Sequence, residues 1–178
     1  MTYHIALCDD DAVQREYLEQ KLSLFAEARQ VEFVFTHFPS AEAFLFHYRE
    51  NRNTDLLFLD IEMAKMNGID LAKTLREEGS PLQIVFITGY PDYVGQGYDV
   101  EALHYLLKPV GIEKLFEVCH RFLKTMEEQP RFFLFSLGKE VVRLYEKEIL
   151  YGESEGHYVI LHTKTEDLKL RMTVPELE

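Results

Sequence analysis

The sequence has few of the features that mark secreted, membrane or nucleic-acid-coating proteins. Its only two cysteines, Cys8 and Cys119, lie far apart in apolar stretches and give no basis for a disulfide framework or a zinc site. No apolar run approaches the length of a membrane span, and the N-terminus lacks the basic region and cleavage site of a secretory signal. Acidic residues outnumber basic ones by 31 to 19, so the net charge is −12 and any contact with nucleic acid must be local. We therefore expect a soluble, cytoplasmic protein.

The chain does contain a regular alternation of apolar strands and amphipathic helices over its first two-thirds. Hydrophobic residues make up 47% of the sequence, which is ample for a packed core. Five ranges have the pattern of strands: 4–8, 31–38, 55–60, 82–88 and 102–107. Helical patterns separate them, including a short one over about 92–98, and a long one follows over 112–128. This alternation predicts parallel βαβ units in a doubly wound α/β sheet.

The pattern changes after residue 127. Residues 132–145 predict two strands joined by a turn at Gly138, and residues 157–164 and 167–173 predict two more. We therefore expect a first domain over residues 1–127, a linker over 128–130, and a mostly antiparallel β domain over 131–178. Thr173 and Glu176 fit a capping box at the start of a helix, so we expect the second domain to be truncated.

Acidic side chains follow the predicted strands of the first domain. Asp9 and Asp10 come after the first strand, and Asp60 ends the third. Because the carboxyl ends of parallel strands meet at one edge, these carboxylates converge there, and hard oxygen ligands suit Mg²⁺. Thr88 and Lys108, at the ends of the fourth and fifth strands, add a hydroxyl and a cation. Such a set can neutralise a phosphoryl group during transfer to Asp60 as the nucleophile.

Taken singly, most of these residues have ordinary explanations. Asp11 suits a helix cap at least as well as a ligand, a threonine such as Thr88 commonly ends a strand, and an exposed lysine before proline is common. Asp60 differs, because four apolar residues precede it and the segment after it offers no capping role. The combination in strand order therefore carries the prediction.

Four segments, LCDDD, LLFLDIEMAKMNGIDL, IVFITGY and YLLKPV, occur in this order within residues 1–127. Together they resemble the receiver domain of bacterial response regulators. The resemblance implies a five-stranded, flavodoxin-like fold with Asp60 as the phosphoacceptor. It also implies a Mg²⁺ site held by Asp10 and Asp60 directly, by Asp9 largely through water, and by the backbone carbonyl of Glu62.

The same resemblance gives roles to residues of the fourth and fifth strands. Thr88 and Lys108 would contact the phosphoryl oxygens, and Tyr105 would be an aromatic switch that packs inward when Thr88 moves. A phosphoryl group adds about −1.5 to −2 charge, so contacts made only in that state can shift a two-state equilibrium. A plain core aromatic is the alternative interpretation of Tyr105. The resemblance also implies a cis bond between Lys108 and Pro109.

In the second domain, the segment KEILYGESEGHYVILHT resembles the beginning of the LytTR-type DNA-binding domain and covers about half of it. That family reads DNA with loops of a mostly β domain. His157 is the one candidate DNA contact, and an exposed loop histidine is an equally good interpretation. The basic residues of the neighbouring strands suit solvated faces.

The sequence therefore predicts a two-component response regulator. A sensor histidine kinase would phosphorylate Asp60, and phosphorylation would control dimerisation and DNA binding by the complete output domain. We expect no substrate turnover, so the protein would not be an enzyme. Two alternatives are an Mg²⁺-dependent aspartyl phosphohydrolase, favoured by the DIE segment at 60–62, and a receiver that acts only through protein contacts.

Overall fold

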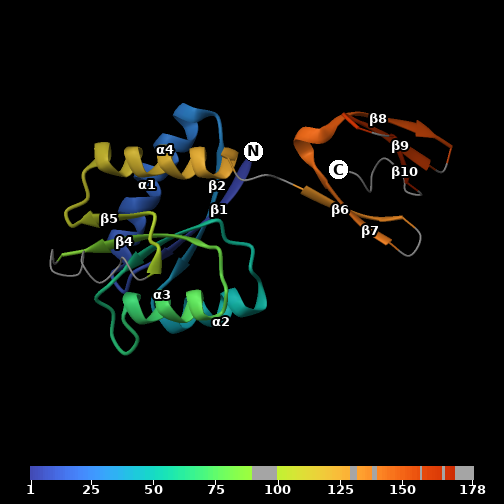
Figure 1. Ribbon diagram of the computed structural model, residues 1–178. Helices are drawn as coiled ribbons and strands as arrows, with labels where there is room; N and C mark the ends of the chain where they lie inside the picture. The colour runs from blue at the N-terminus through green and yellow to red at the C-terminus, as the bar shows by residue number, and fades with distance from the viewer. Residues whose placement is uncertain (90–99, 129–131, 138–139, 157, 166, 171–178) are drawn as a thin grey trace. The chain divides into compact units, whose positions relative to one another are not determined.

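The computed structural model describes residues 1–89, 100–128, 132–137, 140–156, 158–165 and 167–170. The chain divides into two compact units, residues 1–124 and residues 125–178, and each is described by itself (Figure 1). The predicted boundary, with its linker at 128–130, stays a prediction. Among the described residues, no helix is both long enough and apolar enough to cross a membrane.

The first unit is built on a parallel sheet of five strands in the order β2-β1-β3-β4-β5. The strands are β1 (Thr2–Cys8), β2 (Glu32–Phe38), β3 (Leu56–Asp60), β4 (Gln83–Thr88) and β5 (His104–Leu107). All five fall within the predicted ranges or extend them by two residues. The predicted doubly wound fold is confirmed.

Helices cover both faces of this sheet. They are α1 (Ala12–Arg29), α2 (Ala41–Glu50), α3 (Gly68–Glu77) and α4 (Ile112–Glu128). Figure 1 shows α1 and α4 over one face and α2 and α3 over the other. The predicted helix over 92–98 lies outside the described residues.

Side-chain caps fix the starts of three helices. Asp11 accepts a hydrogen bond from Val13 N at the start of α1, at 2.9 Å. Ser40 and Asn67 do the same for α2 and α3. Such caps satisfy backbone donors that have no partner within the helix. The expected role of Asp11 as a cap is therefore confirmed. The neighbouring Asp9 and Asp10 do not serve as the cap of this helix.

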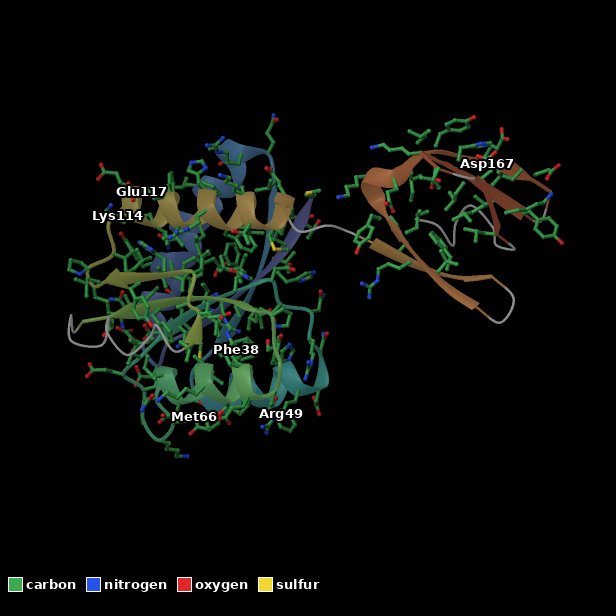
Figure 2. The ribbon with its side chains drawn as sticks, viewed as in Figure 1. Phe38, Arg49, Met66, Lys114, Glu117 and Asp167 are labelled. Carbon is green, nitrogen blue, oxygen red and sulfur yellow. The ribbon has the colours of Figure 1, made fainter. Side chains whose placement is uncertain are left out.

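Burial on both faces explains the apolar strands. All five residues of β3 are buried, including its last residue, Asp60. Between the sheet and α2, the ring of Phe38 packs edge-on against Phe44, with centroids 5.2 Å apart (Figure 2). A strand covered by helices on both faces must be apolar throughout, and this makes a charge at its end conspicuous.

The second unit consists of antiparallel strands, as predicted. β6 (Phe132–Leu137) pairs with β7 (Glu140–Tyr145), and β8 (Ile149–Glu155), β9 (Tyr158–Thr163) and β10 (Asp167–Leu170) form a second sheet in the order β10-β9-β8. A short 3₁₀ helix, Glu146–Glu148, precedes β8. Six buried apolar residues form the core of this unit: Phe135, Leu144, Val159, Leu161, Leu168 and Leu170.

The sequence did not predict β8 as a strand. Six of its seven residues are exposed, and on the core side it presents Gly152, where an added Cβ would lie 3.1 Å from the Leu161 side chain. Without large apolar residues at alternate positions, β8 has no strand periodicity. The predicted turn at Gly138 and the helix start at Thr173 and Glu176 lie outside the described residues.

Candidate functional site

Three carboxylates meet at the carboxyl edge of the parallel sheet. Asp9 and Asp10 follow β1, Asp60 ends β3, and β1 and β3 are neighbouring strands. One oxygen from each of the three residues lies within 4.8 Å of the others. Asp9 and Asp60 are only 2% and 4% exposed, whereas Asp10 is exposed. The predicted acidic cluster therefore forms, with one carboxylate open to solvent.

Lys108 lies between the two buried carboxylates. Its Nζ donates to Asp9 Oδ2 at 2.9 Å and lies 3.3 Å from Asp60 Oδ1. Its backbone N donates to Thr88 O at 2.8 Å, which fixes the end of β5 beside β4. The Lys108–Pro109 bond is cis, as the resemblance implied. The predicted lysine thus contacts the acidic cluster, although 99 residues separate it from Asp9 in the sequence.

One ammonium group does not neutralise three carboxylates, and the pKa of Asp60 reflects this. Burial and the negative charge of Asp9 together raise the pKa of Asp60 to about 6, against the opposing effects of Lys108 and the Glu62 backbone amide. For Lys108, burial lowers the pKa, but the two carboxylates outweigh burial and raise it. The site fits an additional cation with a preference for oxygen ligands, and Mg²⁺ has this preference.

The loop that carries Glu62 folds back tightly against Asp60. Gly68 N donates to Ile61 O at 3.0 Å, and a Cβ on Gly68 would lie 2.2 Å from Asp60 O. Only glycine permits this approach. Farther along the loop, Met66 N donates to a carboxylate oxygen of Glu42 at 3.2 Å. The Glu62 side chain is exposed, so its backbone is the part that faces the site.

Thr88 and Tyr105 lie on adjacent strands. Thr88 is the last residue of β4, fully buried, and pairs with Leu107 of β5. Tyr105 pairs with Phe86, and their rings stack with centroids 4.9 Å apart. The Tyr105 hydroxyl is buried without a hydrogen-bond partner in the described part of the chain, and burial raises its pKa to about 12. Thr88 therefore borders the acidic cluster. Tyr105 lies two residues before Leu107, the residue that pairs with Thr88.

Two residues of α1 for which the sequence predicts no role in the site contact its loops. An Nη1 hydrogen of Arg15 is donated to the backbone oxygen of Asp9, and Tyr17 donates its hydroxyl hydrogen to Val110 O at 3.0 Å. Arg15 stands four residues after the cap Asp11, one helical turn into α1. That spacing is the only signal in the sequence, and it is too common to single out Arg15.

In the second unit, His157 lies outside the described residues. His162 is held between two acids, with Nδ1 2.8 Å from Asp167 and Nε2 3.1 Å from Glu153. Lys169 pairs with Glu155. The exposed face of this sheet is therefore one of paired charges, as expected for a solvated face.

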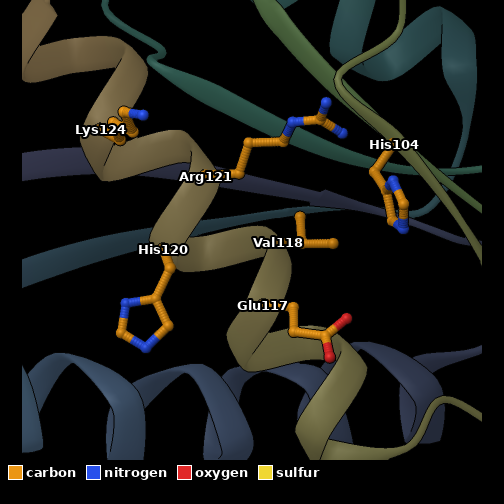
Figure 3. Close-up of a pocket in the computed structure, with 6 residues that line it drawn as sticks. All are labelled: His104, Glu117, Val118, His120, Arg121 and Lys124. Carbon is orange, nitrogen blue, oxygen red and sulfur yellow. The ribbon is translucent and has the colours of Figure 1, made fainter.

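A shallow pocket lies between α4 and β5 of the first unit. Figure 3 shows His104 and Arg121 on one side of α4 and His120 on another; Glu117, Val118 and Lys124 complete the lining. Arg121 donates to Leu103 O at 3.3 Å. His104 begins β5, so this pocket lies at the opposite end of the strand from Lys108 and is separate from the acidic cluster.

Known proteins are similar to this chain over its whole length. The profile of the response regulator receiver domain matches residues 5–120. The transcriptional regulatory protein NatR of Bacillus subtilis is 28% identical over 178 residues, which cover 98% of this chain and 73% of NatR. The sensory transduction protein LytT of Oceanobacillus iheyensis is 30% identical, with coverage of 100% and 74%. The response regulatory domain of mrkE from Klebsiella pneumoniae, 23% identical, shares the fold with a TM-score of 0.63 over 71% of this chain and 99% of that domain.

Proposed function

Because the chain belongs to the family of response regulators with a receiver domain, we propose that Asp60 accepts a phosphoryl group from a sensor histidine kinase. The observation that carries this proposal is the position of Asp60. It is a buried carboxylate at the end of an apolar strand, within 4.8 Å of the oxygens of two further aspartates and 3.3 Å from the ammonium group of Lys108. A carboxylate so placed is a nucleophile with charge compensation beside it.

Asp9, Asp10 and Asp60, with the backbone carbonyl of Glu62, would hold Mg²⁺. When bound, the ion supplies charge neutralisation for the oxygens of the transferred group. An oxygen of Asp60 attacks phosphorus, the P–N bond of the phosphohistidine breaks, and its electron pair leaves with the imidazole, which takes a proton from solvent. Lys108 exchanges its contact with Asp60 Oδ1 for a phosphoryl oxygen.

Thr88 and Tyr105 would report the phosphorylated state. The new phosphoryl oxygens accept a hydrogen bond from the Thr88 hydroxyl, and its movement opens space beside β5 for the Tyr105 ring. The unpartnered Tyr105 hydroxyl supports this role, because a buried hydroxyl without a partner does not favour the present position of the ring over another.

For the output, we propose that the second unit belongs to a LytTR-type DNA-binding domain, with His157 as a candidate contact, and that phosphorylation promotes dimerisation and DNA binding. The antiparallel sheet of this unit and the similarity to NatR, a transcriptional regulatory protein, support the proposal. A histidine-kinase partner also implies a cytoplasmic location.

The phosphohydrolase alternative needs repeated turnover, whereas a receiver is labelled once. The test is to incubate the protein with Mg²⁺ and acetyl phosphate or generic phosphomonoesters, and to follow intact mass and phosphate release together. We expect at most one phosphoryl group per chain, no label on Asp60→Asn, and no turnover of phosphomonoesters. Retained label on Asp60→Asn would refute the role of Asp60, and fast turnover would favour the hydrolase.

The third candidate, a receiver that works only through protein contacts, differs in DNA binding. Specific binding by the full-length protein, measured over a series of salt concentrations, separates it from a transcription regulator. We expect phosphorylation to tighten specific binding, and binding that ignores sequence and phosphorylation would favour the third candidate.

A further inference from the structure

Arg15 is placed against the acidic site by the first turn of α1. Its backbone N donates to Asp11 O at 3.2 Å, which continues the helix from its cap. Its guanidinium donates to the backbone oxygen of Asp9, so it braces the loop that carries the acidic pair. The side chain is half-buried, and its Nε is buried without a hydrogen-bond partner in the described part of the chain.

The positive charge of this guanidinium is not consumed by an ion pair. No carboxylate of the described residues pairs with Arg15, whereas Lys108 already serves both Asp9 and Asp60. Arginine stays protonated at every pH that the protein meets, so its charge is fixed. Arg15 is therefore a permanent positive charge beside a cluster that holds three negative ones.

We propose that Arg15 is a positioning residue that serves as the counter-ion of the metal-free acidic site, and that its charge weakens the affinity of the site for Mg²⁺. The inference rests on the proposed function, because it takes the site to bind Mg²⁺. A fixed cation attracts the three carboxylates when they are alone and repels a divalent ion that joins them. Arg15 thereby stabilises the folded protein without metal and keeps metal binding reversible.

The test compares Mg²⁺ binding by the full chain and three variants at low ionic strength, where surface charges are least screened. Arg15→Gln removes the charge and Arg15→Lys keeps it. Lys21→Gln removes one positive charge from the same helix, where Lys21 lies over the Tyr17 ring at 5.4 Å. From Coulomb attraction at the effective dielectric of a protein surface, we expect Arg15→Gln to bind Mg²⁺ roughly three- to tenfold more tightly than wild type, and the other two variants to stay within about twofold.

Thermal unfolding gives a second readout that a purely structural role would not move. Arg15→Gln should melt below wild type in EDTA, and the difference should narrow at saturating Mg²⁺, because tighter binding to the folded state adds more stability. A difference that is the same with and without Mg²⁺ would overturn the inference, as would unchanged or weaker Mg²⁺ binding by Arg15→Gln. If Arg15→Gln is unfolded in EDTA, recovery of the fold with Mg²⁺ supports the inference, and failure to recover contradicts it.

Failure of the proposed function looks different. A wild-type protein that shows no Mg²⁺ binding by calorimetry and no Mg²⁺-dependent shift in melting would overturn the magnesium site, and this inference with it. Wild-type binding with an Arg15→Gln variant that matches Lys21→Gln overturns the inference alone.

Discussion

The first unit buries charge where the second exposes it. At the edge of the parallel sheet, Asp9 and Asp60 are buried beside one another with Lys108 between them. In the second unit, Thr163 is the one buried polar side chain among the described residues, and the charges of β8 to β10 pair on an exposed face. Burying like charges costs stability, and such an arrangement persists where it has a use. Buried charges therefore identify the functional site of the first unit, whereas the exposed, paired charges of the second unit are those of a solvated sheet.

Backbone approach is the sharpest contrast between the units. A Cβ on Gly68 would overlap Asp60 O, which is backbone, whereas the one tight contact of a Cβ on Gly152 would be with the end of the Leu161 side chain. We expect Gly68→Ala to lower the free energy of unfolding of the first unit by about 3 kcal/mol or more, because backbone cannot move aside as a side chain can. Chemical denaturation measures this change.

The matched controls are Gly111→Ala, where nothing lies within 4 Å of the added Cβ, and Gly152→Ala in the second unit. We expect both to stay within about 1 kcal/mol of wild type. A Gly68→Ala protein as stable as the Gly111→Ala protein would contradict the close approach at Asp60.

Arg76 shows that the first unit also places a charge inside its framework. Its guanidinium donates to the backbone oxygens of Val100, Ser80 and Leu82, at 2.8 to 2.9 Å. We expect Arg76→Ala to cost about 2–4 kcal/mol, because it leaves three carbonyls without their charged donor.

Arg49→Ala is the control for Arg76. Arg49 pairs with Glu78 at the exposed end of α2, where Figure 2 labels it, and an exposed pair contributes much less to stability than a set of buried hydrogen bonds. Equal losses from the two arginines, measured by urea unfolding, would mean that burial does not distinguish them.

The acidic site itself should lower stability when no metal is bound. The folded-state pKa of Asp60 is about 6, above the ordinary value of 3.8, so the folded state favours the protonated form. The wild-type protein therefore loses stability as the pH rises from about 4 to about 6. In EDTA at pH 7, we expect Asp60→Asn to be more stable than wild type by about 1–2 kcal/mol. This value allows for screening of the charges by solvent at the edge of the site. Melting curves from pH 4 to pH 7 measure it, and a wild-type curve parallel to that of Asp60→Asn would refute the repulsion.

The smallest effect is expected in the second unit. In this unit, hydrogen bonds from His162 to Glu153 and Asp167 raise the pKa of His162 above the ordinary 6.5. The stabilisation is fully present below 6.5 and is lost as the pH rises through the folded-state pKa. Hydrogen exchange in β8 to β10 should therefore quicken slightly over that range in wild type and stay level in His162→Gln. A matching rise in the variant would assign the effect to another group.

The residues that the sequence predicted and those that it missed differ in how their positions are encoded. Asp60 and Lys108 were predictable because Asp60 ends a strand and Lys108 directly follows one, and parallel strands bring their ends together. Arg15 and Arg76 donate to backbone carbonyls, which every residue has, so no partner side chain reveals them in the sequence. β8 was missed because its pairing with β9 supplies the strand geometry that its exposed side chains do not encode.

The role of Asp60 is tested most directly by locating the phosphoryl group. The full chain is treated with Mg²⁺ and acetyl phosphate, digested, and mapped by tandem mass spectrometry beside the Asp60→Asn variant. We predict a single phosphoryl group on the peptide that contains Asp60, and none on the variant. A phosphoryl group on any other residue of the wild-type protein, with Asp60 unmodified, would contradict the assignment of Asp60 as the phosphoacceptor.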